Sequence, residues 1–387
     1  MRHFAHLAPA VQDRLFERPP AEWTAASPRA VLAQALGATL YVPGVRTDLT
    51  GTLRRRAAEG TRSMVVDLED AVADDQVDDA VAGVRHALAE LTGDPVPALV
   101  FVRVRTPEHI RVVTADLCPG QVPLAGFVVP KFSAATGARY LAEVAAASER
   151  LGQRLLVMPV LETPDVLYRE SRDEALSAIR DLLAQYREYV LAVRIGATDL
   201  CGLFGIRRDR DLTIYDVGVV AELIAEVVNH LGRADGTGYA ISGPVWEYWA
   251  GHERIFRPQL RSTPFEDRSA GPLRQRMVLR DVDGLLRETV LDRANGLTGK
   301  TVIHPSHVAV VHALSVVPHE EFSDATDILS TADAGVRASG YRNKMNEMRP
   351  HRRWAERTAE RAAAFGVARE GISHVDVLRA LLNGSLR

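Results

Sequence analysis

Two acidic residues, Glu162 and Asp199, each follow an apolar run of the kind that forms a buried β-strand. If those strands are neighbours in a parallel sheet, the two carboxylates meet at one edge, and like charges that close need a cation. Oxygen ligands with few protein donors suit Mg²⁺, and the sequence has no His or Cys cluster with zinc spacing. We therefore predict a Mg²⁺ site at Glu162 and Asp199. The alternative is that each acid only caps a following helix.

A second acidic group follows another apolar run. It consists of Asp67, Glu69 and Asp70, of which Asp67 and Glu69 share one face of an extended strand. Acids placed in this way hold metal-bound water or a nearby arginine, so we predict that all three belong to the catalytic machinery. Asp70 could instead begin the next helix.

Several cations occupy equivalent positions after other apolar runs. Arg46, Arg103 and Arg105 are candidates for substrate binding, because a guanidinium can grip a carboxylate with two hydrogen bonds, and Arg103 is also predicted to belong to the catalytic group. Each could also form an ion pair within the protein. Lys131 is predicted to balance charge in the catalytic group rather than to form a Schiff base. His304 is a candidate acid or base, with a purely structural histidine as the alternative.

Repeated short apolar runs, each followed by a turn and an Ala-rich helical pattern, must position these residues. Their number and nearly continuous apolar character predict a (β/α)₈ TIM barrel, with an open doubly wound sheet as the alternative. The eight predicted strands are Thr39–Pro43, Ser63–Glu69, Leu99–Val104, Gly126–Lys131, Leu155–Glu162, Leu191–Asp199, Tyr239–Val245 and Lys300–Pro305.

The barrel domain is predicted over residues 38–318, with an N-terminal extension at 1–37 and a helical C-terminal extension at 319–387. Four outer helices are clearest from the spacing of Ala, Leu and Val. They are Ala71–Thr92, Ala134–Gly152, Pro164–Tyr189 and Asp216–Leu231. A long aromatic insertion at about 246–290 precedes the last strand, and a connection of that length is usually a lid or binding element.

Composition excludes several classes of protein. The 387 residues are 47% hydrophobic and 25% charged with a formal net charge of −3, which is typical of a globular protein. No basic stripe offers a footprint for nucleic acid, and no apolar run reaches the roughly 20 residues of a membrane span. Two cysteines make no disulfide framework, and the first residues do not resemble a signal peptide. We expect a cytoplasmic protein.

Seven short motifs follow one another along the chain. They are Leu40-Tyr-Val-Pro-Gly44, Asp67-Leu-Glu-Asp-Ala-Val72, Val102-Arg-Val104, Val129-Pro-Lys131, Leu161-Glu-Thr163, Gly196-Ala-Thr-Asp-Leu200 and Gly299-Lys-Thr-Val-Ile-His-Pro305. In order and spacing they resemble the motifs of the citrate lyase β-subunit and HpcH/HpaI aldolase family. The chain resembles more closely a divergent branch associated with tellurite-resistance gene clusters.

This resemblance implies a carbon–carbon bond lyase on a (β/α)₈ barrel. It implies that Glu162 and Asp199 ligate Mg²⁺, that Arg103 binds a substrate carboxylate, and that Asp67, Glu69 and Asp70 form a rim cluster. Members act next to a carbonyl, often on acyl-CoA thioesters, and commonly form trimers or hexamers. We expect cleavage of a small 2-oxo or hydroxy acid through an enolate. Phosphoenolpyruvate-type chemistry and a catalytically degenerate binding or assembly module are the alternatives.

Overall fold

A computed structural model describes residues 1–249, 280–330 and 335–384. Eight parallel strands form its central sheet, in the order β8-β7-β6-β5-β4-β3-β2-β9. A parallel bridge between Gly243 and Lys300 joins the two ends of the sheet, so the strands close into a barrel and the predicted fold is confirmed. The strands are β2 (Ala38–Pro43), β3 (Ser63–Asp67), β4 (Leu99–Arg103), β5 (Gly126–Val129), β6 (Leu156–Leu161), β7 (Ala192–Ile195), β8 (Ala240–Ser242) and β9 (Lys300–Val302).

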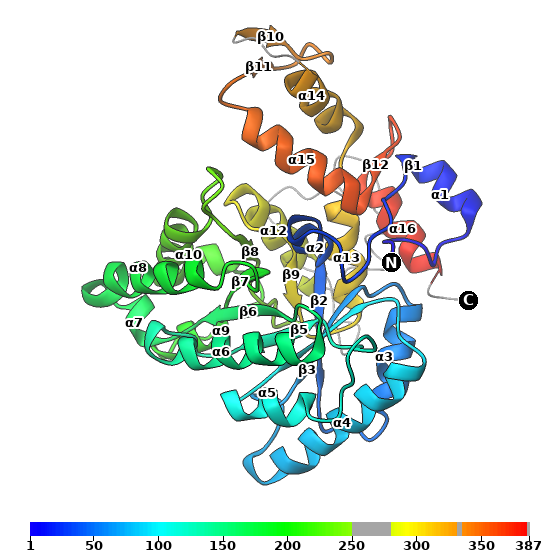
Figure 1. Cartoon of the computed structure of the whole chain (residues 1–387). Coiled ribbons are helices and arrows are strands. Elements are labelled where there is room, and N and C mark those ends of the chain that lie inside the picture. The colour runs from blue at the N-terminus through cyan, green and yellow to red at the C-terminus, as the bar shows by residue number, and fades with distance from the viewer. Residues whose placement is uncertain (250–279, 331–334, 385–387) are drawn as a thin grey trace.

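Helices surround these strands on the outside (Figure 1). Their ends follow from local signals: the helix over residues 134–151 begins after Ser133, whose side chain accepts from the backbone N–H of Thr136, and ends at Gly152 with φ 60°. The outer helices are α3 (Leu49–Ala58), α4 (Val77–Gly93), α5 (Pro107–Thr114), α6 (Ala134–Leu151), α7 (Pro164–Leu167), α8 (Arg169–Gln185), α9 (Ala197–Gly202), α10 (Gly218–Leu231), α12 (Arg280–Ala294) and α13 (Ser306–Ser315).

Three predicted boundaries are wrong. The helix predicted to begin at Ala71 begins at Val77, after a short 3₁₀ turn over Asp74–Gln76. The helix predicted over Pro164–Tyr189 is divided into α7 and α8 at Tyr168, whose backbone is extended. The strand predicted to end at Asp199 ends at Ile195, and Asp199 lies in the first turn of α9. The predicted strand was too long because the short helix α9 begins one residue after Gly196. The apolar residues of the strand and of this helix therefore form one continuous run in the sequence.

The two terminal extensions pack together beside the barrel (Figure 1). Strand β1 (Phe16–Arg18) pairs antiparallel with β12 (Val367–Ala368), which joins the first and last parts of the chain. The C-terminal extension is not wholly helical, because it contains an antiparallel β10–β11 pair between its first two helices. The remaining elements are α1 (Pro9–Leu15), α2 (Arg29–Ala35), α14 (His319–Ser330), β10 (Val336–Ala338), β11 (Met345–Glu347), α15 (Arg352–Phe365) and α16 (His374–Gly384).

A buried ionic network fastens α12 to the barrel wall. Lys300 of β9 is 0% exposed, and its Nζ lies 2.9 Å from a carboxylate oxygen of Glu288 and 2.7 Å from one of Asp292. Arg208 also pairs with Glu288. Tyr215 donates to Asp292 at 2.9 Å. Since each buried charge has a partner, the network holds the last strand and the helix before it in one arrangement.

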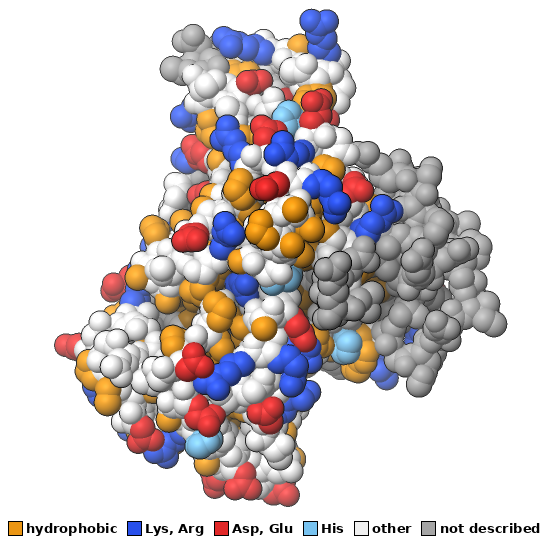
Figure 2. Space-filling model, turned by 90° about the vertical axis from the view of Figure 1, so that its right-hand side faces the viewer, with side chains coloured by type: hydrophobic (Ala, Val, Ile, Leu, Met, Phe, Trp, Pro, Cys, Tyr) orange, Lys and Arg blue, Asp and Glu red, His pale blue; other side chains and the backbone are white. Residues whose placement is uncertain are grey.

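The outer surface gives no sign of a uniformly charged face in the view of Figure 2. Lys and Arg side chains are interspersed there with Asp and Glu. None of the helices in the described part of the chain has the length and apolar content of a membrane span.

Candidate active site

The carboxyl ends of four adjacent strands bring the predicted catalytic group together. Asp67 is the last residue of β3, and it lies beside Arg103, the last residue of β4. Lys131 follows β5 by two residues, and Glu162 directly follows β6. Because parallel strands present their carboxyl ends at one mouth of the barrel, residues distant in the sequence become neighbours there.

Arg103 is held by the protein's own carboxylates. Its Nε and Nη2 each donate to an oxygen of Asp67 at 2.6 Å, which is a bidentate pair. Its Nη1 lies 3.0 Å from both Asp70 and Glu69. A guanidinium has five N–H donors, so these contacts leave a single Nη2 hydrogen for any other acceptor. A bidentate grip on a substrate, as we predicted for Arg103, would require it to give up part of this arrangement.

Lys131 connects the acidic cluster to Glu162 through two different groups. Its Nζ pairs with Glu69, which places it as the predicted charge-balancing cation. Its backbone N–H donates to Glu162 Oε1 at 2.7 Å. Lys131 has φ 46°, in the left-handed region that residues other than glycine rarely adopt. Strain of this kind is typical of functional sites, where the surrounding contacts hold it in place.

Gly196 leaves the space that the Glu162 carboxylate fills. A Cβ at Gly196 would lie 1.9 Å from Glu162 Oε2 and 2.6 Å from Glu162 Cβ. Gly196 also separates β7 from α9, and so it sets where Asp199 lies in the first turn of that helix. The glycine is therefore required by close approach to Glu162, a role that the sequence alone did not reveal.

Glu162 and Asp199 differ from the other acids of the mouth because neither has an ion-pair partner within 4 Å in the part of the chain that the structure describes. Burial, with a smaller contribution from the charge of Asp199, raises the pKa of Glu162 to about 7, although the hydrogen bond from the Lys131 backbone lowers it. Burial and the charge of Asp70 raise the pKa of Asp199. The two carboxylates thus repel each other without a protein cation between them.

This donor set fits a divalent cation. Glu162 is 5% exposed and uses one oxygen for the Lys131 N–H, so Oε2 remains as a ligand atom, and Asp199 is partly exposed beside it. Two carboxylates from rigid elements, with room for water, are the ligands that Mg²⁺ takes. Glu162, Asp199 and the three acids of the cluster make five carboxylates at this mouth. Only two cations, Arg103 and Lys131, form ion pairs with them, and a divalent ion would reduce this excess of negative charge.

The other predicted site residues have the following positions. Arg105 donates from Nε to the carbonyl of Leu68 at 2.7 Å and from Nη2 to that of Glu69 at 2.9 Å, and it pairs with Asp74, so its guanidinium holds the acidic loop. Arg46 is exposed in the loop after β2.

His304 lies after β9, where its Nδ1 is 2.7 Å from Ser306 Oγ. Its ring stacks on Trp249 with centroids 5.6 Å apart. Trp249 lies at the start of the predicted binding insertion, but residues 250–279 of that insertion lie outside the described residues.

Two residues inside the barrel were not singled out from the sequence. The Tyr41 ring of β2 has the Arg103 guanidinium carbon 5.3 Å from its centroid and that of Arg194 at 5.6 Å. Arg194 of β7 is 1% exposed. No sequence motif could have paired these residues, because β2 and β7 are not neighbours in the sheet.

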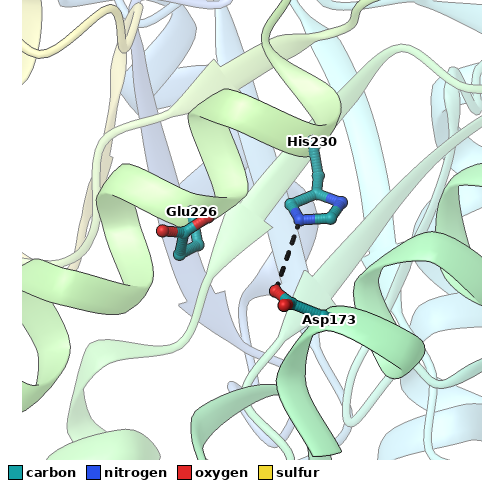
Figure 3. Close-up of side chains that lie close together, drawn as sticks. All are labelled: Asp173, Glu226 and His230. Atoms are coloured by element: carbon teal, nitrogen blue, oxygen red, sulfur yellow. Dashed lines mark ion pairs between the residues drawn. The ribbon is translucent and has the colours of Figure 1, made fainter. Parts of the chain in front are cut away.

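A separate acidic group with a histidine lies on the outer helices and belongs to no predicted site. Asp173 of α8 and Glu226 and His230 of α10 offer ligand atoms within 4.8 Å of one another (Figure 3). His230 Nε2 is 3.7 Å from Asp173 Oδ1, and the Asp173 side chain is 88% exposed. Exposed groups of this composition are common without a metal, and we assign this one no function.

Solved structures with the same fold include several lyases and a synthase. A citrate lyase from Burkholderia xenovorans LB400 shares 19% identity over 88% of this chain and 96% of its own, with a TM-score of 0.60. CitE from Mycobacterium tuberculosis, in complex with magnesium, acetoacetate and coenzyme A, shares 20% identity over 85% and 99% with a TM-score of 0.53. A Haloferax volcanii malate synthase in a magnesium and glyoxylate complex shares 15% over 71% and 73% with a TM-score of 0.50.

The sequence matches none of the curated proteins compared with it. A sequence model of the family described as C–C bond lyase of the TIM-barrel fold matches residues 30–367. That range contains the whole barrel and every predicted site residue. The sequence motifs predicted a carbon–carbon bond lyase on a TIM barrel, and this match confirms it. The chain therefore belongs to the C–C bond lyase family of the TIM-barrel fold.

Proposed function

We propose that this chain is a Mg²⁺-dependent lyase that cleaves, or in reverse forms, a carbon–carbon bond of a small 2-oxo or hydroxy acid. The observation that carries the proposal is the pair Glu162 and Asp199. They lie at one barrel mouth, and both have a raised pKa, to which the charge of Asp199 contributes for Glu162 and that of Asp70 for Asp199. Neither has an ion-pair partner among the described residues, whereas every acid of the adjacent cluster has one.

Glu162 and Asp199 would hold the metal, which supplies a Lewis acid for the carbonyl oxygen on which charge develops as the bond breaks. The remaining roles belong to the chain's own residues. Arg103 holds Asp67 and Asp70 in place by hydrogen bonds, and its free Nη2 hydrogen can reach one further acceptor. Lys131 and Arg46, both exposed, are the cations left to bind a substrate carboxylate.

The solved complexes support the reaction class by their fold and their ligands. CitE of M. tuberculosis was crystallised with magnesium, acetoacetate and coenzyme A, and the H. volcanii synthase with magnesium and glyoxylate. We therefore include a coenzyme A thioester among the acyl partners to be tested. Assembly as a homo-oligomer is part of the same proposal.

Calorimetric titration with Mg²⁺ tests the metal site without knowledge of the substrate. We expect one ion per chain in the wild type, and at least roughly tenfold weaker binding in Glu162→Gln and in Asp199→Asn, because each loses a charged ligand. Asp173→Asn is the matched control, since it removes a carboxylate from the surface cluster instead. Binding that is lost in the control and kept in the two site variants would overturn the assignment.

Pyruvate and oxaloacetate are then titrated with and without Mg²⁺. Binding of either acid that depends on the metal supports the proposed chemistry. Absence of metal-dependent binding of both acids would contradict it and favour the catalytically degenerate module.

A further inference from the structure

The hydrogen-bond ladder between β5 and β6 is interrupted at Lys131. Val129 lies opposite Pro159, and a regular parallel ladder with this register makes the N–H of Lys131 the donor to the carbonyl of Val160. The N–H of Phe132 makes this bond instead, at 3.0 Å. Lys131 is therefore an extra residue at the end of β5, which is a β-bulge.

Other strands of the barrel end without such an interruption. Directly after β2, the N–H of Gly44 donates to the carbonyl of Asp67 at 2.8 Å, as the register of β2 and β3 requires. Directly after β3, the N–H of Leu68 donates to the carbonyl of Arg103 at 3.0 Å, as the register of β3 and β4 requires. The bulge is thus a local feature of the end of β5 and does not follow from closure of the barrel.

The N–H that the bulge removes from the ladder is used by Glu162. It donates to Glu162 Oε1 at 2.7 Å, a short distance of the kind expected for a bond to a carboxylate. Within the described parts of the chain, no other hydrogen bond to this buried carboxylate is found. One backbone group therefore fixes how the carboxylate is turned, and it leaves Oε2, the oxygen beside Gly196, for a metal.

The conformation that aims this N–H is unfavourable for a lysine. Lys131 has φ 46°, and the other non-glycine residues with positive φ among those described, Phe4 and Arg342, lie in the terminal extensions. Glycine adopts this conformation most easily, but glycine has no ammonium to pair with Glu69, as Lys131 Nζ does. A residue that breaks a local backbone rule in order to meet two such requirements is expected at a functional site.

We propose that Lys131 is a positioning residue whose main-chain N–H, aimed by the β-bulge, orients the Glu162 carboxylate for metal binding. Its side chain has the separate task of neutralising Glu69. The inference rests on the proposed function, because it requires a metal at Glu162. It assigns part of the metal affinity to a backbone group, which no ordinary substitution of the lysine side chain removes.

An amide-to-ester change at Lys131 tests this role. The α-hydroxy acid analogue of lysine, introduced by nonsense suppression, replaces the N–H by an ester oxygen and keeps the ammonium. Mg²⁺ affinity, measured by calorimetry, should fall by roughly tenfold or more, because outer partners that orient a metal ligand have effects of this size.

The same change at Phe132 is the matched control, because it removes the ladder bond to Val160 and leaves the N–H of Lys131 in place. Thermal unfolding should be lowered in both esters, whereas Mg²⁺ affinity should fall only in the Lys131 ester. Mg²⁺ affinity of the Lys131 ester within threefold of the wild type, or an equal loss in the two esters, would overturn the inference and leave the proposed function standing.

Amide hydrogen exchange gives a second test that needs no backbone substitution. Glu162→Ala removes the acceptor of the Lys131 N–H, so this amide should exchange roughly tenfold faster or more, while the Phe132 amide keeps its rate. Equal exchange at Lys131 in the wild type and the variant would contradict the inference. A wild type that protects the Lys131 amide but binds no Mg²⁺ would overturn the proposed function, and with it the role of this amide towards a metal.

Discussion

Gly196→Ala should weaken metal binding through a single methyl group. The new Cβ would lie 1.9 Å from Glu162 Oε2, and an ordinary contact begins at 3.4 Å, so the carboxylate must retreat by about 1.5 Å. The new Cβ would also lie 2.6 Å from Glu162 Cβ, so rotation of the Glu162 side chain about its own bonds cannot relieve the clash. Mg²⁺ requires its oxygens at about 2.0–2.1 Å in nearly octahedral positions, so this retreat removes a ligand.

We expect Mg²⁺ affinity, measured by calorimetry, to fall by roughly 10- to 100-fold, the range seen when support of a metal ligand is lost. Gly202→Ala is the control, because it makes the same substitution at the other end of α9, where a Cβ would meet nothing within 4 Å. Equal Mg²⁺ affinity of the two variants, with unfolding temperatures close to that of the wild type, would refute the close approach between Gly196 and Glu162.

Three further results are expected. Lys300→Met leaves buried carboxylates unpaired and should lower the free energy of unfolding, measured by denaturant titration, by about 3–5 kcal/mol. Arg54→Met, the control at an exposed ion pair, should lower it by less than about 1 kcal/mol. Equal losses in the two variants would contradict a stabilising role for the buried network. Burial lowers the pKa of His3 from 6.5 to about 3, so between these two pH values only the unfolded chain binds a proton at His3. The free energy of unfolding therefore decreases as the pH is lowered from 6.5 towards 3. At pH 5 this amounts to about 2 kcal/mol, and His3→Phe should show a correspondingly smaller loss between pH 7 and pH 5. Arg105→Lys should speed amide hydrogen exchange at residues 68–74, since one ammonium cannot replace a guanidinium bonded to several carbonyls, and unchanged exchange would count against its structural role.

The barrel could be predicted from the sequence because its signals are local. Strand and helix periodicities repeat eight times along the chain, and they located all eight barrel strands to within a few residues at most ends. The same logic predicted that Glu162 and the cluster around Asp67 lie at the mouth of the barrel, since these residues end or follow buried strands, and the structure places them there. Asp199 was expected at the end of a strand, and it lies instead in the first turn of α9.

What only the tertiary structure decided is which side chains meet. Arg103 was expected to bind a substrate, but three carboxylates of the chain itself surround it. Tyr41 and Arg194 come from strands that are not neighbours in the sheet, and they meet only across the closed interior. Sequence patterns record the face on which a residue lies, because that depends on backbone periods of two or 3.6 residues. They do not record the partner on the opposite wall, because that depends on closure of the barrel.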